Sequence, residues 1–340
     1  MRVFFGVTVL MLALASPMRA QDVQSVLQSR VAVDPDVAGS DTNAKLFSFV
    51  LAEDRLSISL GKQAIADFVF QDPKVLRPYF SNLKTSDGQQ VTRNHPPREG
   101  KDAMDHDTMH PGIWLAFGDI SGNDFWRNKA SIAHRVFTEK PAVSGNELRF
   151  TTESDLRGTD GRILSVMTNR IRLLSRPSGW MIVWAATFQA ERDIVFGDQE
   201  EMGFGARVAT ELTEKNGGTM LNSKGLASAA KTWGQPAVWC DYYGTVTDRE
   251  MGVMLMASSA NFRESWWHNR NYGLMVANPF GRKAMKQGEL SAVLIKQEKS
   301  LGLTFGALIH SGPGLDREAE YAHFAVAIRK PNVSPTIPME

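Results

Sequence analysis

The stretch ILSVMTNRIRLLSRPSGWMIVWAATFQA, residues 163–190, decides the fold class of this sequence. Within residues 180–188 apolar side chains occupy both alternating positions, which is typical of a central strand covered on both faces. Just before them, Pro177 and Gly179 stand at the second and fourth places of a four-residue turn, where a type I turn favours these residues. The stretch therefore predicts a hairpin in which residues 163–174 fold back against residues 180–188.

The sequence before this hairpin continues the same pattern. Residues 160–161, Asp-Gly, predict a tight turn. That turn joins a strand expected over residues 147–156 to the strand that begins at residue 163. The three consecutive strands predict an antiparallel sheet.

The end of the sequence carries two further strand predictions. Residues 290–295 and 301–309 are expected to pair around residues 298–300, and residues 321–328 are expected to form a closing strand. Strands recur along the chain without the spacing of βαβ units, which argues against a parallel α/β sheet. We therefore predict an all-β fold, a large antiparallel β-sandwich of two sheets.

Composition narrows the class of protein. The chain has 340 residues, of which 43% are hydrophobic and 22% charged, and its formal net charge is +1. Ample apolar material argues against disorder, and the near-neutral charge argues against a nucleic-acid partner. The single cysteine, Cys240, excludes an intrachain disulfide and a cysteine-based zinc site. Since no repeat or boundary is visible, we expect one domain over residues 45–330 and a tail over residues 331–340.

The first twenty residues have the order of a secretory signal peptide. Arg2 is followed by an apolar run over residues 3–15 and by a polar exit that ends at Ala20. A transmembrane helix needs about 20 apolar residues, and neither this run nor any later segment reaches that length. We therefore expect export to the periplasm or the cell exterior, a flexible linker over residues 21–44, and no transmembrane segment in the mature chain.

Chemistry-bearing residues gather first in residues 105–126, which begin with DHDTMHPGIW. Proline, glycine and repeated aspartate predict loops here rather than a strand. His106 and His110 carry imidazoles, which give or take a proton near neutral pH. Trp114 and Trp126 offer flat apolar faces on which a sugar ring can stack. The alternative is a hydrogen-bonded loop whose histidines only hold the backbone.

A second candidate segment covers residues 196–207 and contains several carboxylates. Asp198 and Glu200 would point to the same side if this segment is extended. Like charges held close together raise the pKa of one of them, which suits an acid–base role. Arg207 ends the segment. Solvated turn acids would give the same sequence, so this alternative stays open.

The third candidate segment, residues 266–281, interleaves aromatic and polar groups. It contains the imidazole of His268, the guanidinium of Arg270, the phenol of Tyr272 and the amide of Asn278. Arginine presents a planar fork of donors suited to carboxylates, phosphates or neighbouring hydroxyls. A hydrophobic core explains a single tryptophan well but not this mixture, so we interpret the segment as part of a binding site.

Several common motifs are missing from the sequence. It has no glycine-rich phosphate loop, no dinucleotide fingerprint and no Gly-x-Ser-x-Gly nucleophile turn. His106 and His110 have the spacing of a zinc-binding helix, but Pro111 and Gly112 follow, and Asp107 stands where a metalloprotease has glutamate. No cofactor is expected, although a divalent metal held by His106, His110 and one carboxylate stays open as an alternative.

Five segments together resemble the PmoA-like family of exported bacterial proteins. In the family a tighter histidine cluster followed by arginine stands where this sequence has Met109 and Pro111. The family name implies a metal-dependent oxygenase, with His106, His110 and a nearby aspartate as ligands. The late motif is matched by His268, Arg270, Tyr272, Asn278 and Gly281. The five segments cover nearly all of residues 45–330 in the family's order, and they are residues 76–85, 106–126, 196–207, 233–243 and 268–281.

More distantly, a long β-sandwich with histidine and carboxylate on one concave face is similar to galactose-mutarotase-like supersandwiches. This resemblance rests on architecture and residue types, and it implies carbohydrate chemistry.

The function that these features predict is that of a secreted carbohydrate-active protein, an epimerase, lyase or hydrolase, with a small-molecule or oligosaccharide ligand. A histidine would exchange a proton with a sugar oxygen, and a carboxylate would act as the complementary base. Two alternatives remain, a non-catalytic glycan-binding module and a metal-dependent oxygenase. The expected catalytic residues are His106, His110, Asp198, Glu200 and His268, and the expected binding residues are Trp114, Trp126, Arg207, Arg270, Tyr272 and Asn278. The prediction requires the three segments to meet on one face of the fold.

Overall fold

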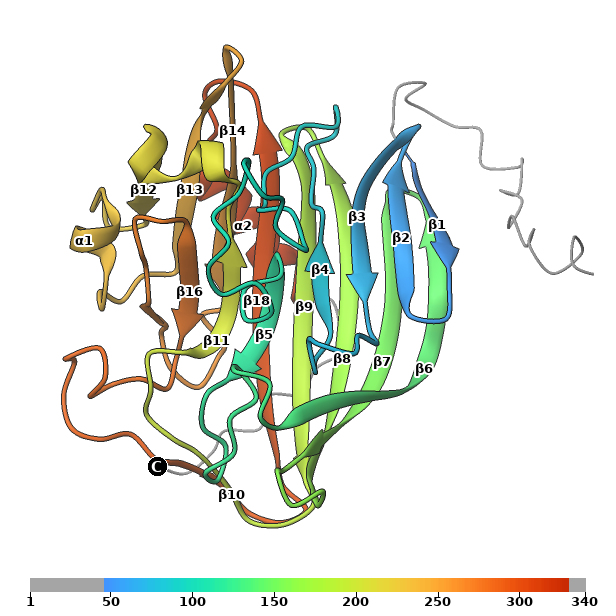
Figure 1. Cartoon of the computed structure of the whole chain (residues 1–340), viewed down its shortest axis with the longest axis vertical. Helices are drawn as coiled ribbons and strands as arrows, with labels where there is room; N and C mark the ends of the chain where they lie inside the picture. Colours follow the sequence, from blue (N-terminus) through green and yellow to red (C-terminus); the bar gives the residue numbers. More distant parts are fainter. Residues whose placement is uncertain (1–45, 330–340) are drawn as a thin grey trace, which may run out of the picture. The chain divides into compact units, whose positions relative to one another are not determined.

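The computed structural model describes residues 46–329, which form two eight-stranded sheets (Figure 1). Neighbouring strands in both sheets pair antiparallel, so the predicted antiparallel β-sandwich is confirmed. The expected signal peptide, the linker over residues 21–44 and the tail over residues 331–340 lie outside the described residues.

The first sheet combines strands from the beginning of the described chain with strands from its later part. In spatial order it contains β1 (Phe47–Leu51), β2 (Arg55–Leu60), β3 (Gln63–Val69), β4 (Tyr79–Ser81), β5 (Ile113–Phe117), β11 (Met202–Arg207), β16 (Leu274–Asn278) and β15 (Trp266–Trp267).

The second sheet contains the longest strands. In spatial order it contains β12 (Thr219–Asn222), β13 (Trp239–Val246), β14 (Arg249–Ala257), β18 (Ser300–Ser311), β9 (Gly179–Ala190), β8 (Ile163–Arg176), β7 (Glu147–Arg157) and β6 (Ser131–Ser144). A separate two-stranded sheet and the short helices complete the fold, namely β10 (Ile194–Phe196) with β17 (Val293–Ile295), α1 (Ala229–Thr232), α2 (Arg317–Ala327) and the 3₁₀ turns Thr210–Leu212 and Glu214–Asn216.

The hairpin that the sequence predicts is the pair β8 and β9. The two strands pair continuously from Ser165 opposite Ala190 to Arg176 opposite Gly179. Gly179 has a φ of 149°, and a Cβ at this position would overlap the carbonyl oxygen of Ile309. Strand β9 lies between β8 and β18, and most of its side chains are buried on both faces. The prediction of a central strand is therefore confirmed.

Two strand predictions near the end of the chain are wrong. Residues 321–328 are not a strand, because Arg317–Ala327 forms α2, whose N-terminus is capped by the Asp316 side chain accepting from the backbone N–H of Ala319. Its apolar side chains, Phe324 among them, pack on the second sheet. Residues 290–295 and 301–309 do not pair, because β17 pairs with β10 and β18 lies between β9 and β14. Short apolar alternation identified these strands but not their partners.

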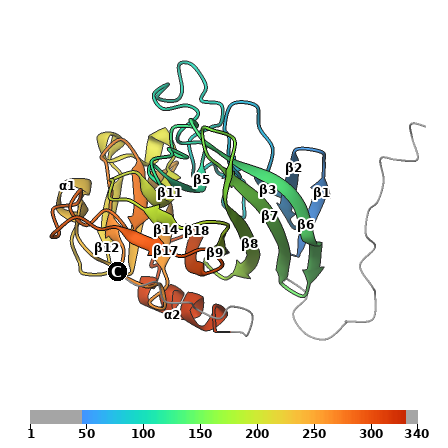
Figure 2. The ribbon, with the colours of Figure 1, turned by 90° about the horizontal axis from the view of Figure 1, so that it is seen from below.

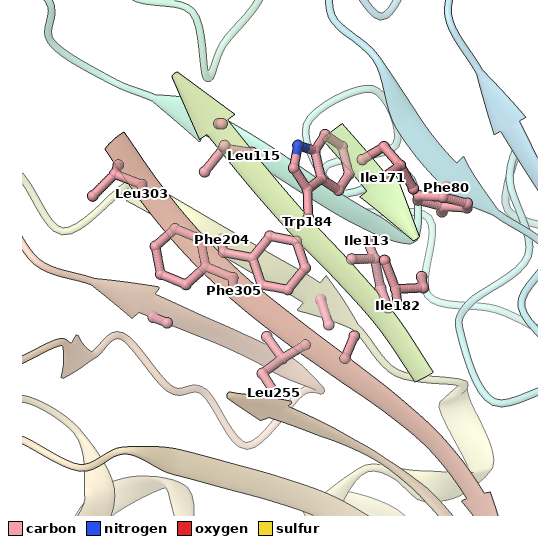
Figure 3. Close-up of a cluster of buried hydrophobic side chains, with 14 of the residues drawn as sticks. Phe80, Ile113, Leu115, Ile171, Ile182, Trp184, Phe204, Leu255, Leu303 and Phe305 are labelled. Carbon is pink, nitrogen blue, oxygen red and sulfur yellow. The ribbon is translucent and has the colours of Figure 1, made fainter. Parts of the chain in front are cut away.

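The main hydrophobic core fills the space between the two sheets (Figure 3). Phe204 of the first sheet stacks on Phe305 of the second, with ring centroids 5.2 Å apart and planes at 9°. Trp184 packs edge-on against Phe204, and its indole N–H donates to the side chain of Asn169 at 2.9 Å. Since every strand alternates, the residues that do not face this core lie on the outer faces of the sheets.

The two outer faces are covered differently. On the first sheet, Met109 and Trp126 belong to loops that pack over Trp114, Leu274 and Val276. On the second sheet, α2 lies against the outer face, on the opposite side of the fold from β5 and β11 (Figure 2). No helix within residues 46–329 has the length and apolar character to cross a membrane.

Candidate functional site

The outer face of the first sheet carries one row of side chains that joins the predicted segments. Trp114 on β5 lies opposite Gly205 on β11, and Gly205 lies opposite Val276 on β16. His268 follows β15 and donates its backbone N–H to the carbonyl of Val276. Because neighbouring strands lie about 4.8 Å apart, about 14 Å separate the backbones of Trp114 and His268. The three segments therefore meet on one face, as the sequence analysis required.

The next row on the same face contains two arginines. Arg207 lies opposite Leu274, and Leu274 forms a bridge with Arg270. Tyr272, on the turn before β16, lies between them, with the Arg207 guanidinium 4.5 Å from its ring centroid. Burial raises the pKa of the Tyr272 phenol, while Arg207 and Arg270 both oppose that rise. Tyr272 is thus close enough to both arginines for their charges to lower its pKa. It lies between two groups of charged residues, one around Asp105 and one around Glu200, which we call the two halves of the site.

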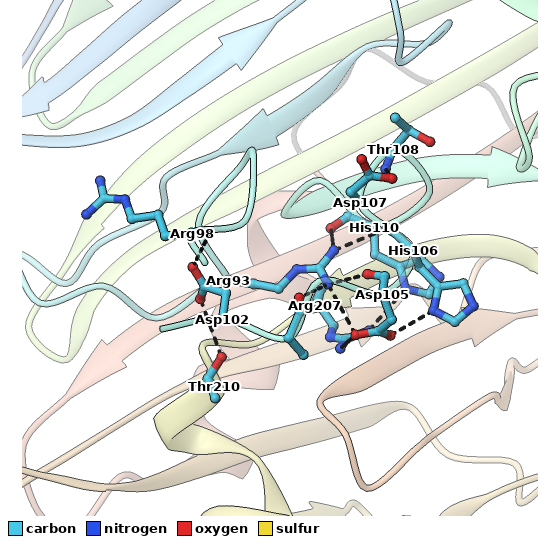
Figure 4. Close-up of polar contacts among 11 residues, drawn as sticks. Arg93, Arg98, Asp102, Asp105, His106, Asp107, Thr108, His110, Arg207 and Thr210 are labelled. Carbon is cyan, nitrogen blue, oxygen red and sulfur yellow. Dashed lines mark hydrogen bonds and ion pairs between the residues drawn. The ribbon is translucent and has the colours of Figure 1, made fainter. Parts of the chain in front are cut away.

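In one half of the site, Asp105 is held by charged neighbours (Figure 4). The Arg207 guanidinium donates to both carboxylate oxygens, at 3.0 and 2.9 Å, and His106 Nδ1 lies 2.7 Å from Oδ2. Arg93 adds an ion pair at 3.6 Å. Partial burial opposes ionisation of Asp105, but the bonds from Arg207 and His106 prevail and hold the pKa of this carboxyl well below its usual range. Asp105 is therefore an anion at neutral pH.

The arrangement fixes the tautomer that His106 is expected to adopt. An ionised Asp105 only accepts hydrogen bonds, so the proton is assigned to Nδ1 and Nε2 is left to accept one. The His106 ring is exposed, and it stacks on Tyr272 with centroids 6.3 Å apart. We call Asp105 and His106 the Asp105 pair.

Arg93 positions the loop that carries the Asp105 pair. It is fully buried, and its guanidinium donates to the backbone carbonyls of Ala103, Asp105, His106 and His110. Arg93 could not be predicted as a site residue, since an isolated arginine in a polar stretch of sequence has no pattern that marks it as buried.

His110 lies beneath this loop. It is buried and stacked on the indole of Trp114, with centroids 5.2 Å apart and planes at 10°. Its Nδ1 is 3.3 Å from Arg207 Nη1, and because a guanidinium only donates, Nδ1 is assigned as the acceptor. Burial lowers the pKa of His110 well below its usual value, and Arg207 adds to the effect. His110 is therefore neutral and packed inside, which does not favour the catalytic role expected for it.

The two tryptophans expected to stack on a sugar are closed to solvent. Trp114 and Trp126 are both fully buried and pack edge-to-face with each other. Trp114 lies under His110 and over Gly205, where a Cβ would come within 2.8 Å of the indole. The prediction of open stacking faces is corrected, because these indoles form the platform under the loop.

In the other half of the site, Glu200 lies between His268 and Arg270. Its Oε2 is 2.9 Å from His268 Nδ1 and 2.5 Å from Arg270 Nη2. The bond to His268 and the charge of Arg270 hold the pKa of Glu200 below its usual value, against the opposing effect of partial burial. His268 is buried, and the Arg270 guanidinium lies 5.8 Å from the ring centroid of Trp233. We call Glu200 and His268 the Glu200 pair.

Asp198 and Asn278 hold backbone in place. Both carboxylate oxygens of Asp198 accept from backbone N–H groups, those of Lys283, Ala284 and Ser291. Asn278 is buried and donates to the carbonyls of Gln199 and Glu200, while its oxygen accepts from two backbone N–H groups of the following turn. Through these contacts Asp198 and Asn278 position the backbone around the site. The contacts do not support the expected catalytic role of Asp198 or ligand contact by Asn278, and Asp198 and Glu200 bind different segments rather than acting together.

A cavity of about 200 Å³ lies beside Asp105. Asp105, Arg207 and Tyr272 form part of its lining. The remaining lining comes mainly from the segment after β11, which the sequence analysis did not single out because hydroxyl and amide side chains in a turn carry no distinctive pattern. These residues are Ala103, Val208, Thr210, Thr213, Lys215 and Asn216.

The metal site left open by the sequence does not fit the geometry. The rings of His106 and His110 stack face to face, with centroids 5.0 Å apart and planes at 29°. Nδ1 of one faces Asp105 and Nδ1 of the other faces Arg207, so these nitrogens do not converge on one ion. Between residues 46 and 329 no group of three or more His, Cys, Asp or Glu side chains has the geometry to hold a metal.

Comparisons with known proteins give one family and several remote structural relatives. The family described as "Family of unknown function (DUF6807)" matches residues 55–324. A search of curated proteins found no match. None of these matches carries the name PmoA, so that resemblance stays a prediction.

Among solved structures, the fold is similar to a galactose mutarotase-like protein from Clostridium acetobutylicum, with 10% identity, 79% of this chain and 99% of that chain covered, and a TM-score of 0.42. It is also similar to a galactose 1-epimerase from Lactobacillus acidophilus, with 8% identity, 79% and 100% coverage, and a TM-score of 0.40. A heparan sulfate lyase from Pedobacter heparinus matches at 9% identity over 83% of this chain and 38% of that one, with a TM-score of 0.36. At these values the similarity is remote.

Proposed function

The chain belongs to the DUF6807 family, and we propose that it is a carbohydrate-active enzyme that performs acid–base chemistry on a sugar derivative. The reaction would take place on the outer face of the first sheet. The observation that carries the proposal is an exposed imidazole, His106, bound to an immobilised carboxylate, Asp105, that itself lines a cavity.

His106 is the group we propose to move the proton. Its Nδ1 bonds to Asp105, and Asp105 cannot swing away because buried Arg207 holds both of its oxygens. Nε2 of an imidazole fixed in this way can take a proton from a substrate hydroxyl and return it. Positioned acid–base groups of this kind contribute about 10²- to 10⁴-fold to a rate.

The lining of the cavity supports a sugar as the substrate. Hydroxyl, amide and ammonium groups surround it, in Thr210, Asn216 and Lys215, and these are groups that pair with sugar hydroxyls. Tyr272 supplies the partly exposed aromatic ring that Trp114 and Trp126 do not. Because burial raises its pKa, the phenol stays protonated and can donate a hydrogen bond to a substrate oxygen.

The Glu200 pair is proposed to act as the complementary half. Glu200 is ionised and partly exposed, so it can accept from a second substrate hydroxyl, and Arg270 lies at the surface beside it. The alternative of a non-catalytic glycan-binding module is less favoured, because such a module needs open indole faces and the two tryptophans of this site are buried. Export from the cytoplasm is part of the proposal and rests on the sequence of residues 1–20.

The test is a screen of purified protein against a panel of neutral sugars and uronic acids. Nuclear magnetic resonance detects epimerisation or anomer exchange, ultraviolet absorbance detects the double bond made by a lyase, and a reducing-end assay detects hydrolysis. We expect one substrate to turn over in the wild type and the rate to fall at least 100-fold in His106→Gln.

The control variant is His323→Gln, which replaces an exposed histidine on α2, on the far side of the fold. It should leave turnover and the melting temperature unchanged. Equal turnover in His106→Gln and the wild type would rule out the proposed proton transfer.

A further inference from the structure

A groove of about 550 Å³ lies on the outer face of the second sheet, away from the site just described. It runs beside the C-terminal end of α2, which Figure 2 shows on that side of the fold. Strands β7, β8, β9 and β18 supply its floor. Four arginines and two glutamates line it, namely Arg149, Arg170, Arg172, Arg329, Glu139 and Glu147.

Arg172 and both glutamates already have partners. The guanidinium of Arg172 donates to the two carboxylate oxygens of Glu147, at 2.8 and 2.7 Å, and to the carbonyl of Ala327 at the end of α2. Glu139 accepts a hydrogen bond from Thr151 at 2.6 Å. The bond to Ala327 holds the end of α2 against the sheet. The bonds to Glu147 neutralise the positive charge of Arg172.

Within residues 46–329, the guanidinium groups of Arg149 and Arg170 make no hydrogen bond or ion pair with another side chain or with the backbone, although both residues pair through their backbones in the sheet. Arg149 lies directly opposite Arg172 on the neighbouring strand, and Arg170 lies two residues before Arg172 on the same face of β8. Like charges directly opposite each other destabilise a sheet. The carboxylate of Glu147 already offsets this repulsion at Arg172. In the part of the chain that the structure describes, Arg149 and Arg170 have no such carboxylate paired with them, so a negatively charged ligand in the groove would pair with these two guanidinium groups.

The part of the groove floor on β9 and β18 contains small and hydroxyl-bearing residues. Ala185, Gly302 and Thr304 lie side by side on β9 and β18, and a Cβ at Gly302 would have no neighbour within 4 Å. Ser258 and Asn261 continue the surface at its edge. The hydroxyl groups of Ser258 and Thr304 and the amide of Asn261 can pair with the hydroxyl groups of a ligand, beside apolar residues such as Val183 that also line the groove.

The strands of the floor also exclude a common way of binding peptides. Strands β7, β8, β9 and β18 are each paired on both sides, so none offers a free edge to which an extended peptide could add. An acidic peptide would therefore lack the main-chain bonds that give such complexes their affinity.

We propose that this groove binds an acidic oligosaccharide, with uronate carboxylates paired to Arg149 and Arg170 and sugar hydroxyls over Thr304 and Ser258. Guanidinium groups bind carboxylates through two parallel hydrogen bonds. The proposal does not rest on the function proposed for the first sheet, since none of these residues lies near the Asp105 pair.

The test is isothermal titration calorimetry of the full chain with tetragalacturonate. The wild type should bind it, and the double variant Arg149→Gln/Arg170→Gln should bind at least about tenfold more weakly, because each lost charge-assisted bond costs a measurable fraction of the affinity. Turnover of any substrate of the first sheet should be the same in the wild type and this double variant.

The matched control is Lys62→Gln/Arg192→Gln, which removes two exposed positive charges elsewhere on the surface. It should bind as the wild type does, and a neutral tetrasaccharide should give no heat with the wild type. The proposal is overturned if the double variant binds tetragalacturonate as tightly as the wild type does. It is also overturned if tetraglutamate binds the groove more tightly than tetragalacturonate, which would make it an acidic-peptide site.

Discussion

Each half of the site on the first sheet combines a carboxylate, a histidine and an arginine, but the two halves bury different members of this set. Beside Asp105, Arg207 is buried, with 1% of its side chain exposed, and His106 is exposed, at 42%. Beside Glu200, His268 is buried, with 4% of its side chain exposed, and Arg270 is exposed, at 36%. Both carboxylates are ionised, but a histidine reaches the solvent in one half of the site and an arginine in the other.

This difference assigns different tasks to the two halves. A buried arginine holds its carboxylate rigidly and leaves an imidazole free to exchange protons with a substrate. A buried histidine instead orients its carboxylate, and the exposed arginine beside it can bind a substrate but cannot take up a proton at neutral pH. We therefore expect chemistry at the Asp105 pair and binding at the Glu200 pair.

Replacing the two carboxylates one at a time should give the largest contrast. Asp105→Asn removes the charge that fixes the tautomer of His106, so kcat should fall about 100-fold. Glu200→Gln should mainly raise KM, with kcat falling less than about tenfold. Steady-state kinetics on the substrate found in the sugar screen measure both. The reverse outcome, a larger loss of kcat in Glu200→Gln, would move the chemistry to the other half.

Replacing the two arginines should separate the halves by stability. Arg207→Gln removes two charge-assisted bonds from a buried group and loosens the loop above β5, so the free energy of unfolding should fall by about 2 kcal/mol. Arg270→Gln removes a surface contact and should cost less than about 1 kcal/mol. Urea unfolding followed by tryptophan fluorescence measures both. Equal losses would mean that the Arg207 half is not the more rigid one.

The sequence predicted the strands and their class better than their pairing. The hairpin at residues 163–190 was predictable because Pro177 and Gly179 fix a local turn and the apolar alternation on both sides is long. The partner of β18 was not, because pairing of β18 with β9 brings together residues more than a hundred positions apart. Residues 321–328 were mistaken for a strand because most of them belong to α2, and the Asp316 cap that starts this helix acts only when its neighbours are already helical.

The candidate residues were predictable as a group, but several of their tasks were not. His106, Glu200, His268 and Arg270 stand in polar, turn-rich segments, which the sequence marks clearly. Burial decided the rest. Trp114 is the second residue of a five-residue strand whose side chains are all buried. Whether a loop covers its outer face depends on how residues 94–112 fold around Arg93. An apolar repeat every 3.6 or 2 residues predicts a helix or a strand, but it does not show whether a loop covers the outer face of that element.

Acid titration between pH 6.5 and pH 5 should act on the Asp105 half through His110. His110 is neutral in the folded state because its pKa lies well below 6.5, whereas in the unfolded chain it takes up a proton near pH 6.5. The unfolded state therefore binds more protons below that pH, so the stability due to His110 is fully present above pH 6.5 and is lost as the pH falls toward the folded pKa. The loss is at most about 1.4 kcal/mol per pH unit.

His110→Asn, which keeps an acceptor for Arg207, lacks this titration, so the difference in unfolding free energy between wild type and variant should shrink from pH 6.5 to pH 5. A difference that stays constant over this range would show that His110 is charged inside the fold, and the Asp105 half would then hold one more positive charge than its geometry implies.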